Sequence, residues 1–142
     1  MSTKMLHFLN ALARAFEQNR LLDLAEHFVF PVPVYIHKGL LVFGSADTLS
    51  EALEEYRKTA EKSGIIRLVP RVIAEGLSIK RQSNMWVELD HLDANGTCLR
   101  TSQIRFMMRH TEGNFFPQVE LVDYQVTAFP ELAEHLPLAM PA

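Results

Sequence analysis

The sequence predicts an α+β domain in which a curved antiparallel sheet is covered on one face by three helices. The second half of the chain holds three long apolar-rich runs separated by turn signals at 80–84, 93–96 and 111–114, as in an antiparallel meander. The first half holds three segments whose apolar residues repeat with the period of a helix. Because helices and long strands are segregated along the chain, an α+β arrangement fits better than a parallel sheet.

The first expected element is a helix that begins at Ser2 or Thr3, either of which can cap it. Its apolar residues lie on one stripe, which comprises Met5, Phe8, Leu9, Leu12 and Phe16. A shorter helix follows, and Pro31 prevents its continuation. Its apolar stripe comprises Leu21, Leu24, Ala25 and Phe28.

A short hairpin and a third helix complete the first half of the chain. The hairpin strands are expected at 34–36 and 40–43, because these residues are β-branched, aliphatic or aromatic and flank a Lys-Gly turn. Thr48 and Glu51 then have the spacing of a capping box, and Asp47 is an equally good N-cap. The apolar stripe of this helix comprises Leu49, Ala52, Leu53, Tyr56 and Ala60.

The turn Asn95-Gly96 sets the expected register of the first long hairpin. A two-residue type I′ turn there places Met85 opposite Phe106, Val87 opposite Ile104, and Leu89 opposite Ser102. A four-residue loop at 111–114 places Phe106 opposite Val119, Ile104 opposite Leu121, and Ser102 opposite Asp123. These pairings put one almost wholly apolar face toward the helices. No register is predicted for 65–80, because both of its alternations are partly apolar.

One end of this predicted core face is polar. It comprises His91, Arg100, Ser102, Asp123 and Gln125. Apolar walls with a few fixed polar groups are typical of a small-molecule site. In the alternative interpretation, the strands extend beyond the helices and these side chains meet water.

The order of elements resembles the cone-shaped fold of the nuclear transport factor 2-like superfamily, which includes SnoaL-like and ketosteroid isomerase-like proteins. The resemblance covers about residues 3–130 and includes the short hairpin that follows Phe28-Val29-Phe30-Pro31. It implies a strongly bent sheet that encloses a deep pocket. Members include isomerases, dehydratases, epoxide hydrolases, polyketide cyclases and non-enzymatic association domains, so the fold does not determine the function.

Three residues are expected to do chemistry in this pocket. Asp123 is the expected acid or base, because burial and a neighbouring Arg100 would act on it in opposite directions. Arg100 or a tyrosine would stabilise developing negative charge, and His91 suits proton transfer near neutral pH. Structural pairing of Asp123 with Arg100 and Ser102 is the alternative. The expected substrate-binding residues are Tyr35, His37, Tyr56, Ser102 and Gln125.

The leading functional hypothesis is a small-molecule-binding domain for a hydrophobic ligand. It would include cofactor-independent isomerases, dehydratases and hydrolases that act by general acid/base catalysis. The alternative is a non-catalytic ligand-binding or association module, and the sequence leaves both open. No metal site is expected, because the six histidines lack ligand spacing and Cys98 has no cysteine partner.

The outer face of the meander is expected to form a homodimer interface. The residues predicted for this interface are Trp86, Arg105, Glu120 and Tyr124. Aromatic residues and arginine are enriched at interface cores, and a contiguous apolar patch is uncommon on a monomer. The resemblance agrees, because members of the superfamily often dimerise through this face.

Composition limits the remaining possibilities. The 142 residues, 48% of them hydrophobic, fit a single domain at 1–130 followed by a proline-rich tail at 131–142. The net charge of −3 provides no basic field for nucleic acid, and neither a membrane segment nor a secretion signal is visible. A cytoplasmic location is therefore the expectation.

Overall fold

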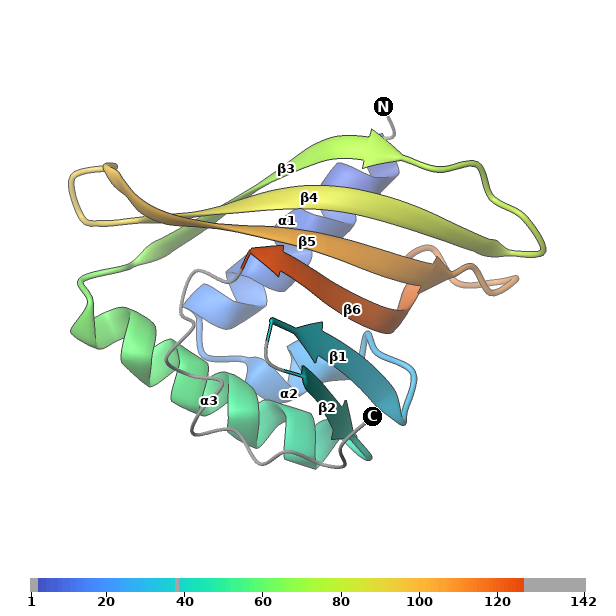
Figure 1. The fold of residues 1–142 in the computed structure, drawn as a ribbon, viewed down its shortest axis with the longest axis horizontal. Coiled ribbons are helices and arrows are strands. Elements are labelled where there is room, and N and C mark those ends of the chain that lie inside the picture. The colour runs from blue at the N-terminus through green and yellow to red at the C-terminus, as the bar shows by residue number, and fades with distance from the viewer. Residues whose placement is uncertain (1–2, 38, 127–142) are drawn as a thin grey trace.

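The computed structural model describes residues 3–37 and 39–126, in which three helices pack on one face of a curved six-stranded sheet (Figure 1). The helices are α1 (Thr3–Glu17), α2 (Leu21–Ala25) and α3 (Ala46–Lys62). The strands are β1 (Val32–Ile36), β2 (Gly39–Phe43), β3 (Arg67–Glu75), β4 (Gln82–Leu92), β5 (Cys98–Arg109) and β6 (Gln118–Val126). The predicted α+β class is confirmed, and the predicted tail at 131–142 lies outside the described residues.

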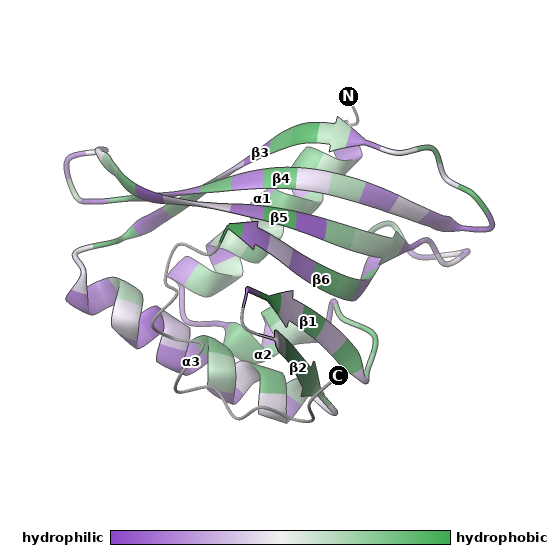
Figure 2. Ribbon diagram, viewed as in Figure 1, coloured by the Kyte–Doolittle hydropathy of each residue, from purple (hydrophilic) through white to green (hydrophobic). Residues whose placement is uncertain are grey.

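The strand order in the sheet is β2-β1-β6-β5-β4-β3. Neighbouring strands are antiparallel except β1 and β6, which run parallel, with Val34 opposite Val122 and Tyr35 opposite Asp123. The short hairpin is therefore joined to the meander through the last strand. Figure 2 shows hydrophilic residues interspersed with hydrophobic ones along β4 and β5, as expected of strands with one face in the core.

The helices form as their periodicity predicts. All five residues of the predicted α1 stripe are buried, and Phe8 has no exposed surface. In α3, Leu49 and Ala60 are buried. The predicted caps of α3, Thr48 and Asp47, are wrong, because the helix begins at Ala46. The Ser45 hydroxyl accepts a hydrogen bond from the Thr48 amide at 3.2 Å and is the N-cap.

The register of β4 and β5 is confirmed although the predicted turn is wrong. Met85 lies opposite Phe106, Val87 opposite Ile104, and Leu89 opposite Ser102. The loop has three residues instead of two, because the Asp93 amide donates to the Thr97 carbonyl. A bulge at Leu99 then adds one residue to β5. The two deviations cancel, so the core face is unchanged.

The predicted register of β5 and β6 is wrong, and a bulge reverses the faces of β6. Val119 lies opposite Met108 instead of Phe106, because the preceding loop is longer than predicted. Leu121 lies opposite Met107, which leaves Glu120 without a partner residue. The side chains after Glu120 therefore exchange sides. Val122 and Tyr124 face the helices, whereas Leu121, Asp123 and Gln125 lie on the outer face of the sheet.

Strand β3 also contains a bulge, at Ile73, between the pairs Val72–Val87 and Ala74–Trp86. Before this bulge, Leu68, Pro70 and Val72 are buried toward the helices. Strand β3 thus completes the wall of the core opposite the short hairpin.

Candidate functional site

A cavity of about 180 Å³ lies between the helices and the sheet. All three helices and all six strands contribute lining residues, including Leu12 of α1, Leu53 of α3 and Ile104 of β5. The lining side chains are apolar apart from two tyrosines, Tyr56 and Tyr124, and no charged side chain of the described residues lines it. The cavity is therefore a hydrophobic site with two hydroxyl groups.

Tyr124 reaches the cavity from β6 because the bulge at Glu120 turns it inward. Burial raises the pKa of its hydroxyl to about 12. The hydroxyl is thus protonated throughout the physiological range, so it can donate a hydrogen bond to an oxygen atom of a ligand.

Tyr56 reaches the cavity from α3 and is hydrogen bonded to His91 of β4, with 2.7 Å between its hydroxyl oxygen and Nε2. The other ring nitrogen, Nδ1, lies 3.1 Å from the Leu89 carbonyl oxygen. A carbonyl only accepts hydrogen bonds, so we place the imidazole proton on Nδ1. Nε2 then accepts a hydrogen bond from the Tyr56 hydroxyl, which defines the direction of the pair.

His91 has no exposed surface and does not itself line the cavity. Burial lowers the pKa of His91, and the carbonyls of Leu89 and Arg100 oppose this shift without reversing it. The imidazole is therefore neutral at pH 7. Tyr56 lies between this neutral base and the cavity, and its ring also packs edge-to-face on Phe16 with 5.6 Å between centroids.

The predicted polar end of the core face exists only in part. Ser102 is fully buried opposite Leu89, and Arg100 lies opposite His91, as the confirmed β4–β5 register requires. Strand β6, however, ends at Val126 opposite Gln103. It therefore brings no carboxylate to Arg100 or Ser102, and neither residue lines the cavity.

The prediction that Asp123 lies on the inner face of the sheet is wrong. The bulge at Glu120 turns Asp123 to the outer face, where one of its oxygens lies 3.4 Å from Arg105 Nη2. The Gln125 side chain donates to the same carboxylate oxygen at 3.0 Å. Asp123 and Gln125 therefore contact neither Arg100 nor the cavity.

Two further predicted binding residues lie away from the cavity. Tyr35 is 40% exposed on the outer face beside Asp123, because Val34 and Ile36 are the β1 residues that line the cavity. His37 is exposed in the turn that follows β1. The alternation of the hairpin is thus opposite to the one predicted. Of the predicted substrate-binding residues, only Tyr56 lines the cavity.

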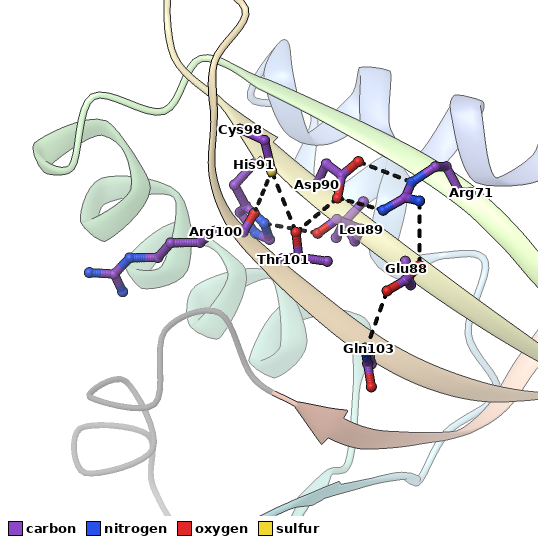
Figure 3. Close-up of polar contacts among 9 residues, drawn as sticks. All are labelled: Arg71, Glu88, Leu89, Asp90, His91, Cys98, Arg100, Thr101 and Gln103. Carbon is purple, nitrogen blue, oxygen red and sulfur yellow. Dashed lines mark hydrogen bonds and ion pairs between the residues drawn. The ribbon is translucent and has the colours of Figure 1, made fainter.

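The outer face carries a hydrogen-bonded network that extends across β3, β4 and β5 (Figure 3). Arg71 donates to both oxygens of Asp90, at 3.0 and 2.9 Å, and its Nη1 lies 3.4 Å from Glu88. Thr101 also donates to Asp90 at 2.9 Å. Partial burial raises the pKa of Asp90, but the hydrogen bonds from Arg71 and Thr101 outweigh it and hold the pKa below its ordinary value.

The residues predicted for the dimer interface divide between the two faces. Trp86 and Arg105 lie opposite each other on the outer face, and Arg105 donates to Asn84 at 2.8 Å. Glu120 forms an ion pair with Arg109 and accepts a hydrogen bond from Gln82 at 2.9 Å. Tyr124 was predicted at the interface and instead lines the cavity. The dimer itself stays a prediction.

Comparison with known structures identifies the fold. A domain of unknown function with a cystatin-like fold from Nostoc punctiforme superimposes with a TM-score of 0.68 at 15% identity, over 96% of this chain and 85% of the other. An NTF-2 like protein of unknown function from Shewanella oneidensis gives a TM-score of 0.62 at 10% identity, over 85% and 95%. The chain has the nuclear transport factor 2-like fold. Aln2 from a Streptomyces species matches this chain with a TM-score of 0.65 at 11% identity, over 93% of this chain and 92% of the other.

At these identities the comparisons establish the fold of the chain and no activity. Neither a scan against protein-family models nor a search of curated proteins gives a match. Within residues 3–37 and 39–126, no group of three or more His, Cys, Asp or Glu side chains is placed to hold a metal ion. In the same part of the chain, no helix has the length and apolar character needed to cross a membrane.

Proposed function

We propose that the protein binds a small, uncharged, hydrophobic molecule in the cavity between the helices and the sheet. The observation that carries this proposal is the lining, in which two tyrosine hydroxyls are the polar side-chain groups of an otherwise apolar wall. Burial of apolar ligand surface in such a site contributes about 25 cal/mol of binding free energy per Å². A few hydrogen bonds then orient the ligand.

The volume of the cavity limits the size of the ligand. An apolar cavity of about 150 Å³ holds benzene. The volume of about 180 Å³ found here therefore suits a ligand with a single ring. Sterol-like molecules are too large unless the helices move.

The lining also limits the charge of the ligand. An ionised carboxylate or ammonium group loses its hydration in an apolar cavity, which costs several kcal/mol unless an opposite charge compensates. The charged side chains Arg105 and Asp123 pair with each other on the outer face instead. A neutral ligand with one hydrogen-bond acceptor for Tyr124 fits this arrangement best.

The acid/base role that the sequence suggested for Asp123 is better suited to the Tyr56–His91 pair. Tyr56 lines the cavity, and His91 is a neutral base behind it. This pair supports a cofactor-independent enzyme of the isomerase, dehydratase or hydrolase type. The competing hypothesis is a non-catalytic ligand-binding or association module.

Binding is tested by calorimetric titration with benzaldehyde, benzoate and benzylammonium, which share a ring and differ in charge. Benzaldehyde is expected to bind and to raise the melting temperature, whereas the two ions are not. Ala52→Leu, which places a larger side chain at the cavity wall, should abolish binding. Ala74→Leu on the exposed outer face is the matched control and should not. The proposal would be contradicted if all three compounds bound equally well. It would also be contradicted if no neutral single-ring compound bound.

A further inference from the structure

The most exposed large apolar side chains of residues 3–37 and 39–126 lie at one end of the sheet. Leu77 is 88% exposed, and Ile79 and Phe115 are each 68% exposed. Leu77 and Ile79 belong to the connection between β3 and β4, and Phe115 belongs to the connection between β5 and β6. Because these four strands are antiparallel neighbours, both connections lie at the same end of the sheet (Figure 1). A group of exposed apolar side chains is a mark of an interaction site.

Contacts hold the two connections and the start of α1 together. The His110 amide donates to the Arg81 carbonyl at 2.8 Å, and Arg81 Nη2 lies 3.6 Å from Glu112 Oε2. The Lys4 ammonium of α1 lies 5.5 Å from the centroid of the Phe115 ring. These segments therefore form one surface. We call it the tip, and it comprises Lys4, Leu77, Ile79, Lys80, Arg81 and Phe115.

Lys80 and Arg81 occupy a strained turn at the tip. Ile79 and Gln82 exchange two backbone hydrogen bonds, at 2.8 and 3.0 Å, so Lys80 and Arg81 are the two central residues of a tight hairpin turn. Their φ angles are 53° and 67°, in the left-handed region that a type I′ turn requires. Asn-Gly is the usual sequence of such a turn, and other residues are strained there. Two long cationic side chains at these positions therefore favour a role in binding over a role in stability.

The tip is locally cationic although the whole chain has a net charge of −3. Lys4, Lys80 and Arg81 carry three positive charges, against two negative charges on the adjacent Glu75 and Glu112. The Arg81–Glu112 ion pair is exposed to solvent, where such a pair is weak, so Arg81 stays available to an outside partner. Lys and Arg side chains are attracted to anionic lipid headgroups.

We propose that the tip binds the surface of a lipid membrane that carries anionic headgroups. Leu77, Ile79 and Phe115 enter the boundary between headgroups and acyl chains, while Lys80 and Arg81 contact the headgroups. The protein binds only at the membrane surface and needs no spanning helix for it. The tip lies outside the cavity, so this inference goes beyond the ligand binding proposed above and does not depend on it.

The shape of the tip favours a lipid surface over a protein partner. A stable protein interface buries about 800 Å² on each partner. The apolar part of the tip consists of single side chains on two narrow connections, which cover only a part of such an area. A fluid bilayer accommodates projecting side chains one by one and requires no matching surface.

Co-sedimentation with vesicles tests the proposal. The wild-type protein is expected to sediment with vesicles of phosphatidylcholine and phosphatidylserine in equal amounts more than with vesicles of phosphatidylcholine alone, and added salt should weaken this binding. Leu77→Ser should lower the partition coefficient about tenfold, because one apolar side chain no longer leaves water. Leu99→Ser, at the opposite end of the sheet and also exposed, is the matched control and should retain binding.

A second variant separates the role of the cations from folding. Lys80→Asn combined with Arg81→Gly gives the turn its usual sequence, so the melting temperature should not fall. The loss of two cations should nevertheless lower binding to the mixed vesicles about thirtyfold. Undiminished binding by this double variant would reject the role of Lys80 and Arg81.

The remaining outcomes decide between a membrane and other partners. Absence of wild-type binding to the mixed vesicles would overturn the proposal, and this measurement depends on no variant. An equal loss in Leu77→Ser and Leu99→Ser would also overturn it, because the tip would then not be the binding surface. A smaller mass of Leu77→Ser in light scattering would show that a second copy of the chain covers the tip instead. Ala52→Leu, at the cavity wall, should still bind the vesicles, so the two proposals fail separately.

Discussion

His91 is a buried imidazole whose protonation is linked to folding. Burial lowers its pKa, as it also lowers the pKa values of His27 and His110. An unfolded histidine has a pKa of about 6.5, so below this pH the unfolded chain binds protons that the native chain does not yet bind. The free energy of unfolding should therefore fall as the pH decreases from about 6.5 toward the lowered native pKa values.

The contribution of His91 to this pH dependence can be isolated by substitution. Urea unfolding at pH 7.5 and pH 5.5 is expected to show a smaller loss of stability for His91→Gln than for the wild-type protein. An unchanged pH dependence in His91→Gln would show that His91 has the same proton affinity in both states.

Asp123→Asn tests the corrected position of Asp123. The residue pairs with Arg105 at 3.4 Å, and about a quarter of each side chain is exposed, 27% in both cases. Partly exposed ion pairs contribute at most about 1 kcal/mol, so a small loss of stability is expected. Ligand affinity should not change, because the side chain lies on the opposite face from the cavity. A loss of affinity by tenfold, measured by calorimetry, would contradict this position.

At the scale of elements, the helices could be predicted because each one satisfies a single period. The α1 stripe of Met5, Phe8 and Leu12 needs no information from elsewhere in the chain. The β4–β5 register could be predicted because one face is apolar and the other polar, which penalises a slip by one residue. Two local deviations, in the turn and at Leu99, did not affect it.

The faces of β6 could not be predicted, since a bulge changes them. Without the bulge, the alternation from Val119 places Leu121 and Asp123 inward, and nothing in the residues around Glu120 marks the extra position. The cavity residue Tyr124 was therefore assigned to the outer face and Asp123 to the inner one. Tyr56 could be predicted, because its position depends only on the period of α3.

The N-cap of α3 provides a test at this scale. Ser45→Ala removes the acceptor of the Thr48 amide and should cost about 1 kcal/mol, or about 3 °C in melting temperature. Asp47→Asn changes the cap suggested by the sequence and affects only the interaction with the helix dipole, worth a few tenths of a kcal/mol. The melting temperatures of the two variants show whether Ser45 or Asp47 is the main N-cap. A larger loss for Asp47→Asn would show that Ser45 is not the main cap.

At the scale of the whole molecule, we propose that the outer face of the sheet forms a homodimer. Because Val122 and Tyr124 face the cavity, this face is less apolar than the sequence suggested. Trp86 and Tyr35 are still about 40% exposed there, at 39% and 40%. Arg105 lies beside Trp86, and its partners Asn84 and Asp123 belong to the same chain. An interface on this face would therefore bury charges that are already paired.

Light scattering tests the dimer. The wild-type protein is expected to have the mass of a dimer at micromolar concentration. Trp86→Glu places a charge at the centre of the face and should give a monomer. Leu77→Glu, in the exposed segment after β3, is the matched control. A monomeric wild-type protein, or a Trp86→Glu variant that stays dimeric, would reject this interface.

The parallel pairing of β1 with β6 has a consequence for how the chain folds. Val34 and Val122 are neighbours in the sheet although they lie 88 positions apart in the sequence, at positions 34 and 122. Contacts between residues so far apart slow folding, since a long loop must close before they form. During synthesis, α1, α2 and the β1–β2 hairpin emerge first, and their apolar surfaces have no complete sheet to cover until β6 has left the ribosome. The nascent chain is therefore most exposed to aggregation during the interval between the synthesis of α1 and that of β6.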